Sequence, residues 1–124
     1  MSYLTDKKRV LGLGSAKEGV GHFTLQRITA IALLPLAVLF VIPFARNLGG
    51  EYENVLHSYG HPFNAVVAIL FFVTAFTHLR LGLQVVIEDY VHGKAMRTAL
   101  LLGNTLFCWL FIALGVFAVL KIAL

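Results

Sequence analysis

The chain of 124 residues is 59% hydrophobic and 13% charged, with a formal net charge of +4 at pH 7. Soluble domains carry about 25% charged residues, so the composition excludes an ordinary soluble enzyme and indicates a membrane protein of one domain at most. The positive charge could suggest a nucleic-acid partner, but the basic residues lie at segment ends rather than on a face with aromatic side chains. Membrane topology explains them better, and we expect no nucleic-acid partner.

The sequence lacks the motifs of several kinds of chemistry. It has no G-x-G-x-x-G nucleotide loop and no cysteine cluster for iron–sulfur, so no dehydrogenase active site is expected within this chain. The single cysteine, Cys108, lies in an apolar run, which excludes disulfides within the chain and assigns it to packing. The first apolar run begins near Phe23, and no small-residue cleavage site follows a short apolar region, so we expect no cleavable signal peptide.

Residues 1–21 are polar, rich in glycine and rich in basic side chains. Because glycine disfavours a stable helix, we expect a flexible or loosely docked N-terminal segment that a soluble partner orders. The remainder, residues 22–124, is expected to form an all-α membrane domain.

Three apolar stretches are each long enough to span a bilayer, which requires about 20 apolar residues. The expected helices cover about 22–45, 62–88 and 99–122. Pro35 and Pro43 interrupt the first, and membrane helices tolerate proline because neighbours satisfy the freed carbonyls. We expect Pro35 to kink this helix. Pro62 is a favourable first residue for the second helix.

Two connections join the expected helices. Residues 46–61 are expected to form a loop; its His57 and His61 have the i, i+4 spacing of metal ligands on a helix, but no third ligand follows and a solvated loop is favoured. Residues 89–98 are expected to form a short turn. In the third helix, Asn104 and Thr105 can bond across a helix interface, and the rest is assigned to packing.

Basic residues are distributed unevenly between the two sides of the expected helices. The N-terminal segment carries four, followed by Arg27, whereas the first connection has only Arg46, the second has two, and the C-terminus has Lys121. The positive-inside rule therefore predicts a cytoplasmic N-terminus and second connection, with the first connection and the C-terminus on the opposite side.

The second expected helix carries polar residues inside its apolar run. A central charged side chain costs about 2.5–3.5 kcal/mol on insertion scales, so such residues are candidates for function. Asp89 follows His78 by eleven positions, which places it roughly 20° from the same helix face. Gly82 lies on that face and leaves a gap beside the imidazole. This arrangement suits a planar macrocycle whose iron the histidine ligates, but a lone membrane histidine can also simply bond to a neighbouring helix.

Arg80, Gln84 and Glu88 form a separate stripe at i, i+4 and i+8 on this helix. The stripe can be an internally satisfied polar ladder that lowers the cost of burial. It can also be a route for protons or water. The sequence leaves both interpretations open.

The pattern H-x3-G-x-Q-x4-D-Y-V-H-G resembles the smaller hydrophobic membrane anchor of succinate dehydrogenase, the respiratory complex II. Its residues here are His78, Gly82, Gln84, Asp89, Tyr90, Val91, His92 and Gly93. An Arg-x-Thr-Ala-Ile entry to the first helix, beginning at Arg27, and three helices of suitable length extend the resemblance over most of the chain.

The resemblance implies a cofactor and a substrate site. His78 would be one of two axial ligands of haem b, with the second ligand from a partner anchor protein in a shared helix bundle. Tyr90 would hydrogen-bond a carbonyl of ubiquinone, and Asp89 would orient that site by pairing with an arginine of the partner. Without the resemblance, Tyr90 is interpreted as an interfacial anchor.

Arg27 lies near the entry of the first helix and has two open roles. It can extend to lipid headgroups or hold a haem propionate, since Arg binds two oxygens at once; the resemblance implies the propionate. The family commonly has a histidine six positions before this arginine. Here that position is Gly21, and the nearest histidine is His22, whose role near the haem stays open.

The resemblance also implies partners and a location. A flavoprotein subunit with FAD would oxidise succinate, and an iron–sulfur subunit would relay electrons to ubiquinone at the membrane surface. A bacterial inner membrane is expected rather than a mitochondrial one. The alternatives are the anchor of a fumarate reductase, or a non-redox structural membrane protein in which His78 and Tyr90 only pack and anchor.

Overall fold

The computed structural model describes Thr5, Lys7, Val10 and residues 19–124. Residues 19–124 are helical apart from short connections and contain no strand. The helices are α2 (Gly19–Asn47), α3 (Tyr52–Gly60), α4 (Pro62–Tyr90) and α5 (Lys94–Ala123). The expected flexible segment, residues 1–21, lies mostly outside the described residues.

Three of the helices, α2, α4 and α5, are long and apolar enough to cross a membrane, which confirms the expectation of three spans in an all-α protein. The helices are longer than hydrophobicity predicted. Gly19 and Gly21 belong to the first turn of α2, so the expectation that glycines would keep this short part non-helical is wrong. Helical hydrogen bonding extends past the apolar residues because backbone groups need partners whatever the side chains are.

The second connection is also shorter than predicted. The expected turn over residues 89–98 is reduced to residues 91–93, because α4 continues to Tyr90 and α5 begins at Lys94. Gly93 caps α5, and its carbonyl accepts a 2.8 Å hydrogen bond from the Arg97 N–H. The polar residues at the start of α5 were therefore misassigned to the turn on composition alone.

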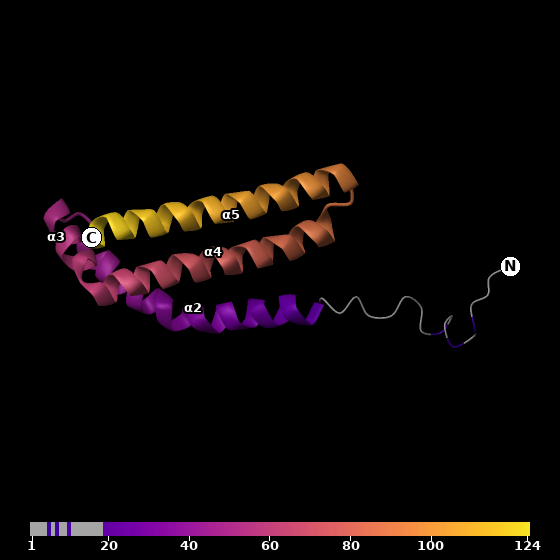
Figure 1. The fold of residues 1–124 in the computed structure, drawn as a ribbon, viewed down its shortest axis with the longest axis horizontal. Helices are drawn as coiled ribbons and strands as arrows, with labels where there is room; N and C mark the ends of the chain where they lie inside the picture. Colours follow the sequence, from indigo (N-terminus) through magenta and orange to yellow (C-terminus); the bar gives the residue numbers. More distant parts are fainter. Residues whose placement is uncertain (1–4, 6, 8–9, 11–18) are drawn as a thin grey trace.

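The expected loop over residues 46–61 is wrong in its centre, where α3 forms a two-turn helix. Glu53 lies in the first turn of α3, where a negative charge is favourable. Tyr59 is buried, and Val55 packs beside the buried cluster of Tyr59, Ala65, Ala68 and Val119. This apolar face explains why so short a segment is helical. α3 contacts α2, α4 and α5 at the end of the molecule that also holds the C-terminus (Figure 1).

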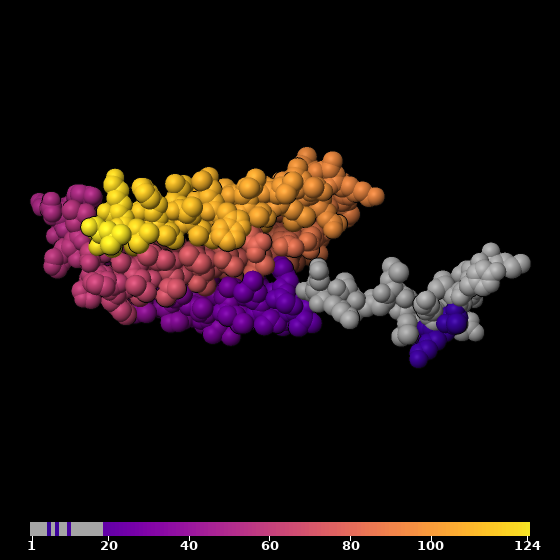
Figure 2. Space-filling model, viewed as in Figure 1, coloured from indigo at the N-terminus to yellow at the C-terminus, as the bar shows by residue number. Residues whose placement is uncertain are grey.

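The three spans lie side by side in one layer with α4 in the middle (Figures 1 and 2). α4 packs directly against both α2 and α5, whereas the backbones of α2 and α5 do not approach each other closely. Few span residues are buried: Thr29 in α2, four apolar residues in α4, and Cys108 and Val119 in α5. Both faces of the layer are therefore left for lipid or for other proteins.

Phenylalanine rings connect the three spans. Phe40 of α2 stacks on Phe71 of α4 with ring centroids 4.4 Å apart, and Phe76 of α4 stacks on Phe111 of α5 at 5.5 Å. Gly115 of α5 allows a close approach, since a Cβ there would lie 2.8 Å from the Phe72 ring. The large rings and one small residue thus determine how closely α5 approaches α4.

Two polar residues of α5 were expected to form hydrogen bonds across a helix interface, and only one of them does. Asn104 Nδ2 donates to the Arg80 carbonyl of α4 at 2.9 Å, as expected for a bond across the interface. The same expectation for Thr105 is wrong, because its hydroxyl donates to Leu101 O within α5. Cys108 is buried and free, and its thiol donates to Asn104 Oδ1 at 3.6 Å.

Pro35 and Pro43 both lie inside the continuous helix α2, and a kink at Pro35 stays a prediction.

Candidate functional site

The main polar cluster within the layer lies between α2 and α4. His22, Gln26 and Thr29 recur at i, i+4 and i+7 and share one face of α2. His78 of α4 lies against this face, with its Nδ1 3.0 Å from Thr29 Oγ1 and its Nε2 3.5 Å from Gln26 Nε2. Thr29 is the buried polar residue of the described chain, 6% exposed.

The hydrogen bonds of the Thr29 hydroxyl favour one tautomer of a neutral imidazole. The single hydroxyl proton has two carbonyl acceptors in its own helix, Leu25 O at 2.9 Å and Gln26 O at 3.1 Å. Because the proton is used there, Oγ1 accepts a hydrogen bond from Nδ1–H of His78. The neutral ring then has its lone pair on Nε2, which is the form a metal requires.

The Gln26 amide, which is the neighbour of the Nε2 lone pair, makes only a weak contact with it. The Gln26 amide reaches His78 Nε2 only at 3.5 Å, the outer limit of a hydrogen bond. Gln26 Oε1 is buried without a partner, and so is His22 Nε2 two turns from Thr29 on the same face. Buried polar atoms are normally paired, so this cluster is incomplete within the described chain.

Gly82 lies where the helix face predicted it, beside His78. A Cβ at Gly82 would meet the Gln26 Nε2 atom at 3.4 Å and would otherwise find no atom of another helix within 4 Å. The tip of the flexible Gln26 side chain is thus the neighbour of Gly82 in this structure, and a gap beside the imidazole stays a prediction.

Arg27 is not part of this cluster. It is exposed, and its guanidinium carbon lies 5.1 Å from the centroid of the Phe23 ring, a cation–π arrangement. Within residues 19–124 it has no carboxylate partner. Its guanidinium is therefore available to an anion outside this chain, as both interpretations of Arg27 require.

Asp89 and Tyr90 end α4 at the surface. Tyr90 is 78% exposed, and neither side chain has a hydrogen bond within residues 19–124. The eleven-residue separation from His78 corresponds to about 16 Å along the helix. The structure therefore does not bring His78 together with these two residues, which lie at the end of the span.

The stripe on α4 is only partly paired. Gln84 Nε2 donates to Glu88 Oε1 at 3.0 Å, but the Arg80 guanidinium has no hydrogen bond or ion pair within residues 19–124. A fully satisfied ladder is therefore not formed. His57 and His61 lie at the opposite end of α4, and no group of three metal-ligating side chains occurs in the described part of the chain.

Sequence reasoning missed Gln26 and Thr29, and it left the hydrogen-bond partner of His78 unidentified. The available signal was the i, i+4, i+7 spacing of His22, Gln26 and Thr29 at the start of an apolar span. Such spacing indicates a polar helix face that needs a buried partner.

The fold and this cluster define a class: a multi-pass α-helical membrane protein with a polar site between two of its spans. Residues 1–119 match the family described as succinate dehydrogenase/fumarate reductase transmembrane subunit. The chain belongs to this family.

Proteins of similar sequence indicate which kind of transmembrane subunit the chain resembles. The succinate dehydrogenase hydrophobic membrane anchor subunit of Paracoccus denitrificans is 36% identical over the whole chain and 95% of the relative. That of Rickettsia bellii is 36% identical over 86% of the chain and 85% of the relative. The succinate dehydrogenase membrane anchor subunit of Reclinomonas americana is 30% identical over 73% of the chain and 78% of the relative. No solved structure is significantly similar. The chain is thus a membrane anchor that acts as part of a complex.

Proposed function

We propose that this chain, together with a second membrane anchor protein, binds haem b and forms the ubiquinone-reduction site of a bacterial succinate dehydrogenase. The observation that carries the proposal is the contact of His78 with Thr29, which engages Nδ1 and leaves Nε2 with only the long contact to Gln26. Membership of the anchor family and the polar motif on α4 agree with it.

The residues present fit a haem. His78 Nε2 would be one axial ligand, and Gly82 leaves the neighbouring helix surface low. The Gln26 amide would turn away from Nε2, which costs little because its contact is long and its oxygen is unpaired. Bound haem b supplies one-electron storage between the anchors. The second axial ligand would come from the partner anchor.

The remaining residues near His78 would orient its ring and help to hold the haem. Thr29 keeps the His78 ring in one tautomer and one orientation. Arg27, placed beside Phe23 and with no carboxylate partner among residues 19–124, would pair with a haem propionate. His22, with its buried unpaired Nε2, would take a partner in the same region.

Ubiquinone would bind at the end of α4. The exposed Tyr90 hydroxyl would donate a hydrogen bond to one quinone carbonyl, favouring the negative charge that builds on that oxygen during reduction. Asp89 would orient this site by pairing with an arginine of the partner anchor. Electrons would arrive from an iron–sulfur subunit, fed by a flavoprotein subunit that carries FAD.

The distribution of basic residues supports this arrangement. The excess of basic residues at the N-terminus and in the second connection favours a cytoplasmic position for both, in a bacterial inner membrane. Asp89 and Tyr90 precede the second connection directly. The quinone site would therefore face the soluble subunits.

Purification through a tag on this chain tests the proposal. We expect a flavoprotein and an iron–sulfur protein to copurify, with a b-type signal in the dithionite-reduced minus oxidised spectrum. Copurification of both partners without a b-type signal in the spectrum would indicate an anchor that holds no haem. The absence of both partners from an intact preparation would leave a structural membrane protein and contradict the proposal.

A further inference from the structure

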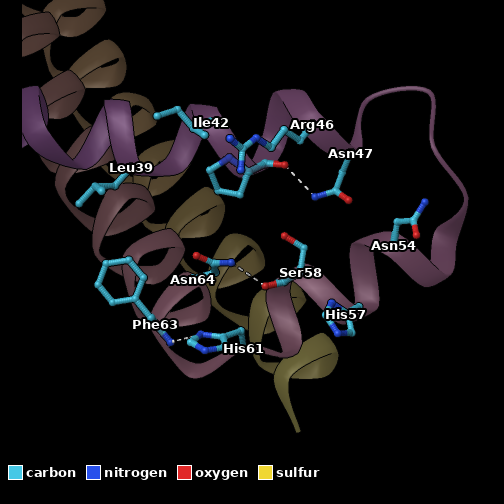
Figure 3. A pocket seen from close by; sticks show the side chains of 11 residues that line it. Leu39, Ile42, Arg46, Asn47, Asn54, His57, Ser58, His61, Phe63 and Asn64 are labelled. Atoms are coloured by element: carbon cyan, nitrogen blue, oxygen red, sulfur yellow. Dashed lines mark hydrogen bonds between the residues drawn. The ribbon is translucent and has the colours of Figure 1, made fainter.

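A cavity of about 610 Å³ lies where the C-terminal end of α2, the helix α3 and the first turn of α4 meet (Figure 3). We call it the Arg46 cavity. It lies at the end of the layer opposite to Tyr90, and none of its lining residues belongs to the His78 cluster. Any function it has is therefore separate from the proposed haem and quinone sites.

The lining of the Arg46 cavity is divided into an apolar and a polar part. Leu39, Ile42 and Phe63 lie on one side of the view in Figure 3, toward the spans. The polar side chains come from the last turn of α2, from α3 and from the start of α4, where His61 and Asn64 lie. Because α2 ends and α4 begins here, this division falls where a span reaches the bilayer surface. The cavity therefore has the polarity of an amphiphile that lies across that surface.

The charge of the cavity is positive. Arg46 is the only residue of the lining with a permanent charge, and no carboxylate lines the cavity. Glu51 and Glu53 are close in sequence but do not belong to the lining, and Arg46 forms no ion pair within residues 19–124. An unpaired guanidinium beside an apolar wall favours an anionic ligand, and its paired donors suit a phosphate.

The walls are held in place by hydrogen bonds that use the asparagines. Asn47 Nδ2 donates to Pro43 O at 2.7 Å, and Asn64 Nδ2 donates to Ser58 O at 2.8 Å. These bonds join consecutive turns of α2 and link α3 to α4. Each bond uses one of the two N–H groups of its amide, so these asparagines hold the walls in place.

Donors remain for such a ligand. His61 Nδ1 accepts from the Phe63 N–H at 3.3 Å, so the proton of its neutral ring is on Nε2. The guanidinium of Arg46, the Ser58 hydroxyl and the His57 ring have no partner within residues 19–124. These groups surround the polar part of the cavity.

We propose that the Arg46 cavity binds an anionic phospholipid. The phosphate pairs with Arg46 and receives hydrogen bonds from Ser58 and the histidines, and an acyl chain lies along Leu39, Ile42 and Phe63. The apolar half of the lining favours a lipid over a soluble anion, because a free phosphate gains nothing from it. The bound lipid joins the end of α2 to α3 and α4.

The test uses the complex purified through a tag on this chain, stripped of lipid in detergent and titrated with phosphatidylglycerol or phosphatidylcholine. We expect Arg46→Gln to weaken phosphatidylglycerol binding about tenfold, as for loss of a charge-assisted hydrogen bond, with phosphatidylcholine binding unchanged. Arg97→Gln removes the same charge beyond the other end of α4 and should leave both unchanged. A second variant, Ser58→Asp, adds a carboxylate to the lining and should weaken phosphatidylglycerol binding similarly.

Two results would overturn the proposal. One is equal phosphatidylglycerol binding by the native, Arg46→Gln and Ser58→Asp complexes. Equal binding would also result if another subunit covered the cavity, and it would overturn the proposal in that case too. The other is displacement of phosphatidylglycerol by inorganic phosphate at equal concentration, which would identify a site for soluble anions. Copurification of the same subunits with each variant controls for assembly, and Ser58→Asp decides the outcome if Arg46→Gln does not assemble.

Discussion

Thr29 and His78 join two spans through one side-chain hydrogen bond, with Oγ1 and Nδ1 3.0 Å apart. The bond lies in the α2–α4 interface, and Thr29 is nearly inaccessible to solvent. For a neutral imidazole it directs the Nδ1 proton toward Thr29 and leaves the lone pair on Nε2, in the interface between α2 and α4.

Replacing Thr29 with valine tests this contact, since it removes the acceptor and keeps the shape. Loss of such a hydrogen-bond partner of a metal-ligating histidine weakens metal affinity roughly 10- to 100-fold. We expect less haem per purified complex and a shifted midpoint potential. Thr105→Val is the matched control, because the Thr105 hydroxyl bonds only within α5. Equal haem content and potential in the two variants would show that Thr29 has no such role.

Gly115→Ala should destabilise the packing of α5 on α4. The new Cβ would lie 2.8–2.9 Å from atoms of the Phe72 ring, and overpacking of this kind costs about 1–3 kcal/mol. Thermal unfolding of the complex in detergent measures the effect. Gly103→Ala, with no atom within 4 Å of the added Cβ, should be neutral. Combination with Phe72→Leu should recover part of the loss, and a Gly115→Ala complex as stable as native would refute the close contact.

The buried Tyr59 phenol should make the folded state less stable at alkaline pH. Burial raises the pKa of Tyr59 above its ordinary value of 10.0, because the interior disfavours the charged form. The folded state therefore holds the phenol proton more tightly, and the stabilisation present below pH 10.0 is lost as pH rises through the raised pKa. Tyr59→Phe should flatten the alkaline part of the stability–pH curve, whereas Tyr52→Phe at an exposed phenol should not. An unchanged curve for Tyr59→Phe would exclude this origin.

Tyr90→Phe should separate quinone reduction from succinate oxidation. Loss of one hydrogen-bond donor aimed at developing charge costs about 10²–10³ in rate where the site is enclosed, and Tyr90 is exposed within this chain, so we expect a smaller fall in ubiquinone reductase activity. Succinate oxidation with a soluble dye as acceptor should be unchanged. Equal quinone rates for Tyr90→Phe and native complexes would favour the interfacial-anchor interpretation of Tyr90.

The three spans could be predicted from the sequence because each apolar run is long enough to cross a bilayer on its own. α3 could not, since its glutamate, asparagine and histidine hide an apolar face that becomes evident only when Tyr59 is buried among residues of α4 and α5. The ends of α4 and α5 were missed because helical hydrogen bonds continue through polar residues such as Lys94 and Arg97.

For the site, His78 and Gly82 were predicted from spacing along one helix. Thr29 was not, because its partner lies 49 residues away and no local pattern encodes which face of α2 meets α4. The open layer, in which the backbones of α2 and α5 stay apart, is likewise a property of pairing between helices rather than of any one segment.

The redox difference spectrum of the His78→Ala complex tests the central claim most directly. His57→Ala is the control, since it removes an imidazole at the opposite end of α4. If His78 is an axial ligand, the b-type signal of the native complex is lost or shifted in His78→Ala and retained in His57→Ala. An identical native-like signal in both variants would contradict the assignment of His78 as a haem ligand.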